Sequence, residues 1–274
     1  MVLPVAGPPI ENGAVLIRGR RIAGVGRWGK MGPGARDRVV DLGDAVLLPG
    51  LVNAHCHLDY TNLAGKLAPP KSFTDWIKGL VALKAAWTLA DFAQSWTDGA
   101  HMLLRSGTTT VADIEALPDL APAMWDATPL RVISFRELIC LKGPPAARSV
   151  FDAAVTPWSA LARLGRLGLS PHAPYTTTPE LLQLAARHAR RRRWRLVTHV
   201  AESREEYDMF AHRKGPLFDW LAAQRDMADC GLGSPIQHLA RCGYLGPNVL
   251  AVHANYLARG DARLLGQNQV NVVH

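Results

Sequence analysis

Six of the ten histidines stand at or just beyond the end of an apolar run that predicts a strand. They are His55, His57, His172, His199, His253 and His274. His55 and His57 form a His-x-His pair, and on an extended chain residues i and i+2 point to the same side, so both rings can face one ion. Neutral imidazole is a good ligand for zinc or iron. The pattern therefore predicts a metal site, the alternative being strand-end histidines in ordinary hydrogen bonds.

Glu202 follows His199 by three residues and is the candidate for proton transfer. A divalent ion lowers the pKa of bound water from 15.7 to about 7, which supplies hydroxide at neutral pH. Glu202 would take the water proton as a general base and return it as a general acid, while His253 would stabilise the hydroxide or the tetrahedral adduct. The alternative is an acidic residue at a helix start, where Ser203 and Glu205 follow.

Three further side chains are candidates for substrate contact. His172 ends a predicted strand before a proline turn and could equally be structural. Trp76, with Phe73, lies in a long connection that could line the substrate, or the two rings could only pack a helix start onto the barrel. Arg136 follows another strand and could offer a polar contact or form a surface pair with Glu137.

Short apolar runs alternate with amphipathic stretches, a pattern that predicts βαβ units and a parallel sheet. The predicted strands are 50–55, 109–114, 130–135, 168–172, 195–200, 249–253 and 270–274. Predicted helices include 75–88 and 179–190, the second with Thr178 as N-cap and Pro179 as first helical residue. The fold class is thus α/β, a (β/α)8-type TIM barrel with about seven strands, whose C-terminal strand ends face the active site.

Residues 1–48 are predicted to form a separate small β-sandwich portion, and residues 49–274 the barrel domain. The β-rich stretches in the first part are 14–17, 21–25, 39–42 and 45–48. They precede the alternating pattern and are separated by Gly-rich segments typical of turns. We therefore expect β structure outside the barrel.

Composition excludes several classes of protein. The chain is 48% hydrophobic and 20% charged, which is typical of a globular protein. No apolar stretch reaches the ~18 residues of a membrane span, and the four cysteines form no Cys-x-x-Cys pair that would indicate a thiolate zinc site. No secretory signal is evident, so we expect a cytoplasmic protein. The net charge of +8 includes an arginine cluster, Arg-Arg-Arg-Arg-Trp-Arg at 190–195, which we interpret as a solvated helix end rather than a nucleic-acid patch.

Taken together and in order, five motifs resemble the amidohydrolase superfamily, in its deaminase and chlorohydrolase branch. They are Pro-Gly-Leu-Val-Asn-Ala-His-Cys-His-Leu-Asp at 49–59, Ser-Gly-Thr-Thr-Thr at 106–110, Pro-His-Ala-Pro-Tyr at 171–175, Thr-His-Val-Ala-Glu-Ser at 198–203 and Val-His-Ala-Asn at 252–255. The likeness runs from about residue 14 to the end. It is greatest to the deaminases of S-adenosylhomocysteine, methylthioadenosine and aminofutalosine.

The resemblance implies a role for each matching residue. His55, His57 and His199 fall on metal ligands, Glu202 on the proton-shuttling carboxylate and His253 on the histidine beside the metal-bound water. His172 falls on a substrate contact. Relatives with two metals carry a lysine that residues 169–172 lack, so the resemblance implies one divalent metal, zinc first, with iron or manganese as alternatives. The implied activity is hydrolytic deamination of an amino-substituted purine or similar heterocycle.

One expected ligand has no counterpart here. The resemblance implies an aspartate after an eighth strand, and the sequence closes with the seventh. We therefore expect a barrel that lacks its last strand. Three alternatives stay open: a chlorohydrolase, a cyclic amidase, and an inactive truncated fragment. The expected partner is a small heterocyclic substrate, with no nucleic acid and no membrane, and a homo-oligomer is compatible with the sequence.

Overall fold

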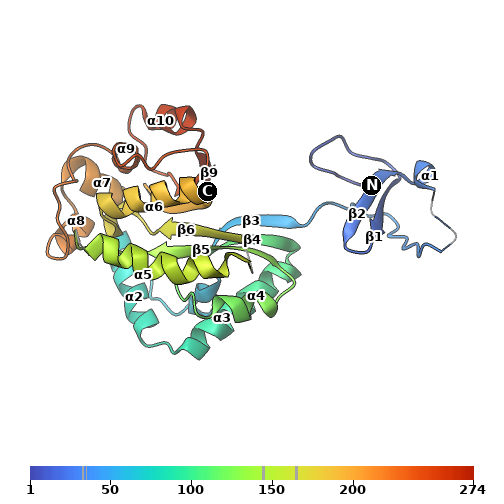
Figure 1. Ribbon diagram of the computed structural model, residues 1–274, viewed down its shortest axis with the longest axis horizontal. Coiled ribbons are helices and arrows are strands. Elements are labelled where there is room, and N and C mark those ends of the chain that lie inside the picture. The colour runs from blue at the N-terminus through green and yellow to red at the C-terminus, as the bar shows by residue number, and fades with distance from the viewer. Residues whose placement is uncertain (33, 35, 144–145, 164–165) are drawn as a thin grey trace. The chain divides into compact units, whose positions relative to one another are not determined.

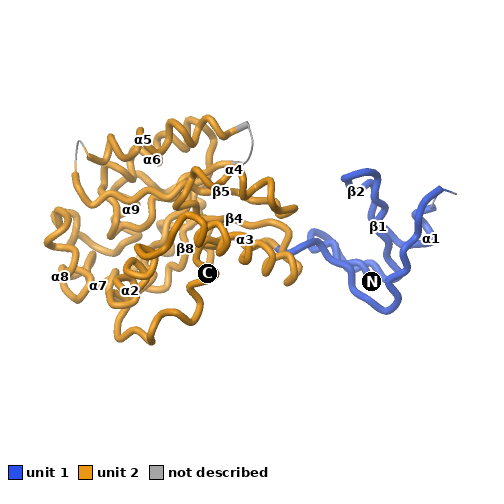
Figure 2. The backbone as a smooth tube through the Cα atoms, turned by 90° about the horizontal axis from the view of Figure 1, so that it is seen from below, with its two compact units in different colours: residues 1–51 blue, residues 52–274 orange. Residues whose placement is uncertain are grey.

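The computed structural model describes residues 1–32, 34, 36–143, 146–163 and 166–274. The chain divides into two compact units, Met1–Leu51 and Val52–His274 (Figure 2). Within the described ranges, no helix combines the length and the apolar character that crossing a membrane requires.

The first unit contains a small antiparallel sheet. Its strands are β1 (Gly13–Arg18) and β2 (Arg21–Arg27), and one turn of helix, α1 (Trp28–Met31), follows. The predicted strands at 14–17 and 21–25 are confirmed, whereas those at 39–42 and 45–48 are wrong. Apart from a bridge between Val2 and Leu47, those stretches have no sheet partner among the described residues. Val40 and Leu42 are 65% and 56% exposed, so the described part of this unit supplies no second apolar layer over them.

The second unit is built on a sheet of seven strands in sequence order (Figure 1). They are β3 (Leu51–Cys56), β4 (Thr108–Glu115), β5 (Arg131–Leu138), β6 (Arg166–Pro171), β7 (Arg195–Val200), β8 (Val249–His253) and β9 (Asn271–Val273). Neighbours from β4 to β9 pair in parallel. Among the described residues β3 and β9 each have one neighbour. This confirms the incomplete TIM barrel.

Helices fill the connections between these strands. They are η1 (Leu58–Leu63), α2 (Phe73–Ala85), α3 (Leu89–Arg105), α4 (Ala121–Asp126), α5 (Ala146–Ala160), η2 (Leu161–Arg163), η3 (Pro174–Thr176), α6 (Pro179–Arg192), α7 (Arg204–His212), α8 (Pro216–Leu221), α9 (Pro235–Arg241) and α10 (Asp261–Gln267). Thr178 caps α6 by accepting the amide of Leu181, and Pro179 is its first residue, as predicted. The helix predicted at 75–88 corresponds to α2, which ends at Ala85, and Thr88 instead caps the next helix, α3.

Alternation along the strands separates an inner and an outer face. Inward side chains from four strands pack together: Ala112, Ile114, Phe135, Val197 and Val252. Residues of opposite parity, such as Leu138, Leu169 and Ala251, pack outside against the helices. Because side chains point to alternate faces, the inner core fixes which strand-end residues reach the mouth of the barrel.

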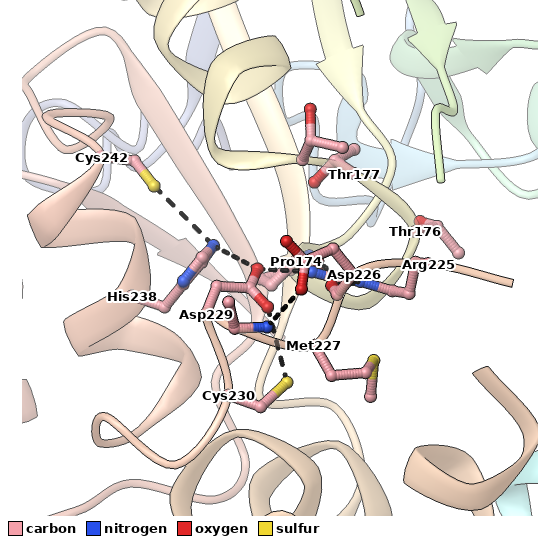
Figure 3. Close-up of polar contacts among 12 residues, drawn as sticks. Pro174, Thr176, Thr177, Arg225, Asp226, Met227, Asp229, Cys230, His238 and Cys242 are labelled. Carbon is pink, nitrogen blue, oxygen red and sulfur yellow. Dashed lines mark hydrogen bonds and ion pairs between the residues drawn. The ribbon is translucent and has the colours of Figure 1, made fainter. Parts of the chain in front are cut away.

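A buried polar network ties the long β7–β8 connection to the loop after β6 (Figure 3). The guanidinium of Arg225 donates to the carboxylate of Asp229 and to the carbonyl of Pro174, the latter at 2.9 Å. Tyr175 is buried beside this contact among apolar side chains of the connection, including Phe210 and Leu217. The β7–β8 connection therefore contacts and stabilises the loop after β6, which begins with His172.

Candidate active site

Three histidines meet at the C-terminal ends of β3 and β7. The Nε2 atom of His199 lies 3.1 Å from that of His57 and 3.2 Å from that of His55. His199 shares the inner face with Val197, which is two residues earlier on β7. The predicted convergence of these rings from distant segments is present in the structure.

The ring of His199 is held so that one nitrogen stays available. Its Nδ1 is 2.8 Å from the carbonyl oxygen of His172, and a carbonyl can only accept, so Nδ1 carries the proton. Nε2 therefore presents a lone pair to His55 and His57. A ligand imidazole oriented through its other nitrogen is the usual arrangement at metal sites.

Burial keeps these imidazoles neutral. It lowers the pKa of His55 to about 3, and it lowers the pKa values of His57 and His199 well below the ordinary value, with neighbouring histidines contributing. Neutral nitrogens at 3.1–3.2 Å from one another need a shared proton or a cation between them. The donor set, all imidazole nitrogen, fits a borderline divalent ion such as zinc.

His253 joins the cluster from β8 through an unusual backbone. Strand alternation would turn His253 away from the inner face that Val252 occupies, yet its ring lies 5.6 Å from that of His199. Its φ of 78° and that of Ala254, 50°, lie in the left-handed region, which redirects the chain here. One ligand atom each from His55, His199 and His253 all lie within 4.8 Å of one another. His253 thus belongs to the cluster, but its ring lies farther from His55 and His199, at 6.0 and 5.6 Å, than the 4.8 Å between those two rings.

Glu202 lies beside this cluster. Its Oε1 is 3.5 Å from Nε2 of His253. Burial raises the pKa of Glu202 to about 7. A carboxyl group with that pKa can accept and return a proton near neutrality, which is the property that a general acid–base residue needs.

His172 and the aromatic residues line the neighbouring side. Nδ1 of His172 is 2.6 Å from Oγ1 of Thr176, and burial lowers its pKa to about 4. Its ring lies 5.7 Å from that of Tyr175, which lies 6.1 Å from that of Phe73. Phe73 in turn stacks on half-buried Trp76 at 5.8 Å. Trp76 is therefore two aromatic rings removed from His172.

Arg136 is not brought to the cluster. It has outer-face parity on β5, and its Nη1 donates to the carbonyl oxygens of Glu115 and Ala116, at 3.2 and 2.8 Å. The hollow it borders is lined by α5 residues such as Val150. Its neighbour Glu137 has the parity of Phe135, which packs in the inner core. Arg136 therefore lies on the outer face of β5 and Glu137 on its inner face.

Sequence reasoning missed a second group at the mouth. The ring of Tyr60 stacks on that of His57 at 4.7 Å, and Nζ of Lys84 lies 4.0 Å from the Tyr60 ring centroid and donates to its hydroxyl. Buried Asp59 and Glu137 are close enough for Lys84 to lower their pKa values, which burial raises. Tyr60 could have been found from its place three residues after His57, whereas nothing in the sequence indicated Lys84.

Comparisons with known proteins found similar sequences. The model of the amidohydrolase family matches residues 46–261. A 5-methylthioadenosine/S-adenosylhomocysteine deaminase from Syntrophobacter fumaroxidans is 29% identical over 285 residues, which are 100% of this chain and 60% of that protein. The chain thus spans about 60% of the length of such a relative.

Solved structures show the same fold at lower identity. The crystal structure of an adenosine deaminase from Xanthomonas campestris with bound zinc has a TM-score of 0.75 and 22% identity, and the match covers 100% of this chain and 60% of that one. For the atrazine chlorohydrolase from Arthrobacter aurescens complexed with zinc, the TM-score is 0.68, the identity 20% and the coverage 95% and 60%.

Proposed function

The chain belongs to the amidohydrolase family, and from that premise we propose that it is a metal-dependent aminohydrolase of an amino-substituted purine or similar heterocycle. The reaction replaces a ring C–NH2 by C=O, consuming water and releasing ammonia. The convergence of the His55, His57 and His199 nitrogens beside Glu202 is the observation that carries this proposal. The similarity to a deaminase of adenosine derivatives supports the substrate class.

The proposed ligands of the ion are His55, His57 and His199, with zinc as the proposed metal. A zinc ion held there would lower the pKa of water to about 7. Zinc-bound neighbours of the same fold support this choice. Iron or manganese would suit the same nitrogen donors less specifically.

Glu202 and His253 are the proposed catalytic residues. With its pKa raised to about 7, Glu202 can take a proton from water and deliver it to a ring nitrogen or to the leaving amine. His253, 3.5 Å from Glu202, can donate a hydrogen bond to the oxygen that adds to the ring. His172 is the proposed polar contact to the substrate. Trp76 lies farther away on the same side and is proposed to line the substrate site there.

The test is a substrate screen on the purified, zinc-loaded chain with three separate readouts: ammonia, chloride and ring opening. We expect ammonia from adenosine derivatives such as methylthioadenosine. Chloride from an aminotriazine would favour the chlorohydrolase alternative, and ring opening the cyclic amidase. Stoichiometric zinc without any product would favour a non-catalytic fragment.

Glu202→Gln is the matched control in this screen. The substitution keeps the size of the side chain and removes its capacity to carry a proton, so zinc content should stay unchanged while turnover falls about 100-fold or more. Turnover equal to that of the wild type would remove Glu202 from the mechanism.

A further inference from the structure

Glu206 is a fully buried carboxyl group that no predicted role accounts for. It lies in the first turn of α7 and is 0% exposed. Its Oε2 accepts the backbone N–H of Glu202 at 2.9 Å. Glu206 therefore holds the amide of Glu202 itself.

The turn that carries Glu202 has a strained backbone. Ala201 has a φ of 52°, in the left-handed region that favours glycine. The carbonyl of Ala201 accepts the amides of Asn255 and Tyr256, at 2.9 and 3.1 Å, and the side chain of Asn255 donates to the carbonyl of Glu202 at 3.0 Å. The segment after β8 thus holds the carbonyl groups of the turn, and Glu206 holds the amide of Glu202.

The arrangement differs from an ordinary capping box. Ser203 caps α7 by accepting the amide of Glu206 at 3.1 Å. In a capping box the glutamate would return to the amide of the cap residue itself. Here it reaches one residue further back, to Glu202, so helix capping alone does not explain where its carboxylate goes.

Glu205, the neighbouring residue, makes a different set of contacts. Its carboxylate accepts the amides of Phe73 and Thr74, at 2.9 and 3.1 Å, and the hydroxyl of Thr74. It thereby caps α2 and does not touch the turn at Glu202. The two adjacent glutamates offer a matched pair of one residue type with separate tasks.

We propose that Glu206 is a positioning residue that fixes the turn from which Glu202 reaches the histidine cluster. Only the kinetic consequence of this proposal rests on the proposed deaminase function. A displacement of about 1 Å at a reacting group lowers turnover by about 100-fold, and so the conformation of this turn would set the catalytic rate.

The kinetic test compares Glu206→Gln, Glu206→Leu and the control Glu205→Gln. We expect kcat to fall about 10-fold in Glu206→Gln, which keeps one acceptor oxygen, and about 100-fold in Glu206→Leu. KM and zinc affinity should stay at the wild-type values, and Glu205→Gln should keep the wild-type kcat. In a Glu202→Gln background Glu206→Leu should cause no further loss, and an equal loss there would overturn the proposal.

A second readout needs neither metal nor activity. Hydrogen exchange measured by NMR should show the amide of Glu202 protected in the wild type and in Glu205→Gln, and exchanging faster in the Glu206 variants. Unchanged protection would overturn the proposal even if turnover falls. The wild-type chain could release no ammonia while the Glu206 variants still exchange faster than it does. That result would leave the positioning role intact and count against the deaminase function alone. Should Glu206→Leu fail to fold, the near-isosteric Glu206→Gln supplies both readouts.

Discussion

At the residue scale, burial decides which charge each group of the site can carry. It lowers the pKa values of the histidines, so their nitrogens offer lone pairs, and it raises those of Glu202 and Glu206 to about 7 and about 8. The same effect therefore prepares the ligands to bind a cation and keeps a transferable proton on the carboxyl groups.

Glu206 should make the free energy of unfolding depend on pH. Its pKa is about 8 in the folded chain against an ordinary 4.5, so between these values the folded state binds a proton that the unfolded state has lost. The stabilisation is complete below pH 4.5 and is lost as pH rises through 8. Urea titrations at several pH values should show the wild type losing stability relative to Glu206→Gln as pH rises. Parallel curves for the two proteins would contradict this assignment.

Arg136 and Glu137 show what the sequence could not decide at this scale. The strand was predicted to end at residue 135, whereas β5 runs to Leu138 and contains both residues. Alternation assigns neighbours to faces only once one residue of the strand is placed. Phe135 supplies that placement through its packing in the inner core. At His55, His57 and His199 the i, i+2 pair and the strand ends indicated a metal site, and the resemblance to the amidohydrolase superfamily selected these three among the strand-end histidines. His253 reaches the cluster because its backbone has a left-handed conformation, which no pattern in the sequence predicted.

At the scale of elements, caps determine where the helices around the barrel begin. Thr88 and Asp91 form a capping box at the start of α3, with the Thr88 side chain accepting the amide of Asp91 at 3.3 Å and the Asp91 carboxylate accepting that of Thr88 at 2.8 Å. The prediction of a helix at 75–88 ran past the end of α2 at Ala85 and took Thr88, the cap of α3, as part of the same helix. A residue that caps a new helix prevents the preceding helix from continuing through it, and apolar periodicity alone does not reveal such a cap.

Thr88→Ala should destabilise the fold by about 1 kcal/mol, because the first turn of α3 loses an acceptor for its amides. Thr88 is exposed, so no packing term is added. Chemical denaturation followed by circular dichroism measures the change, with Thr88→Ser, which keeps the hydroxyl, as the control. A loss of the same size in both variants would show that the methyl group and not the cap is responsible.

The strands of the barrel were predictable because each is a short apolar run closed by turn residues. The first unit was less so, since Val39–Leu42 and Ala45–Leu48 have the β-branched and apolar composition of strands but lack partners in the described residues. Pairing is a property of the whole sheet, and composition carries no information about it.

At the scale of the whole molecule, the two units differ in how much they bury. In the described part of Met1–Leu51, Val2 is the one hydrophobic residue below a tenth exposed, at 4%. The second unit has extensive buried clusters on both faces of its sheet. Protection of a backbone amide reflects the free energy of opening the structure around it.

We therefore expect the amides of β1 and β2 to exchange roughly 100-fold faster than those of β6, β7 and β8. Hydrogen–deuterium exchange with peptide-level mass spectrometry resolves the two groups. Equal protection in both units would mean that the first unit is stabilised by more than the contacts it makes within itself.

We infer that imidazoles at the C-terminal ends of β3 and β7 share one divalent ion. Zinc K-edge X-ray absorption of the purified, zinc-loaded chain tests this inference. We predict one tightly held zinc per chain, nitrogen ligands at about 2.0–2.1 Å and the outer-shell scattering of at least three imidazole rings, with the signal reduced in His199→Ala and retained in the exposed-histidine control His101→Ala. Sulfur ligands at about 2.3 Å, or zinc that is lost on gel filtration, would contradict the claim.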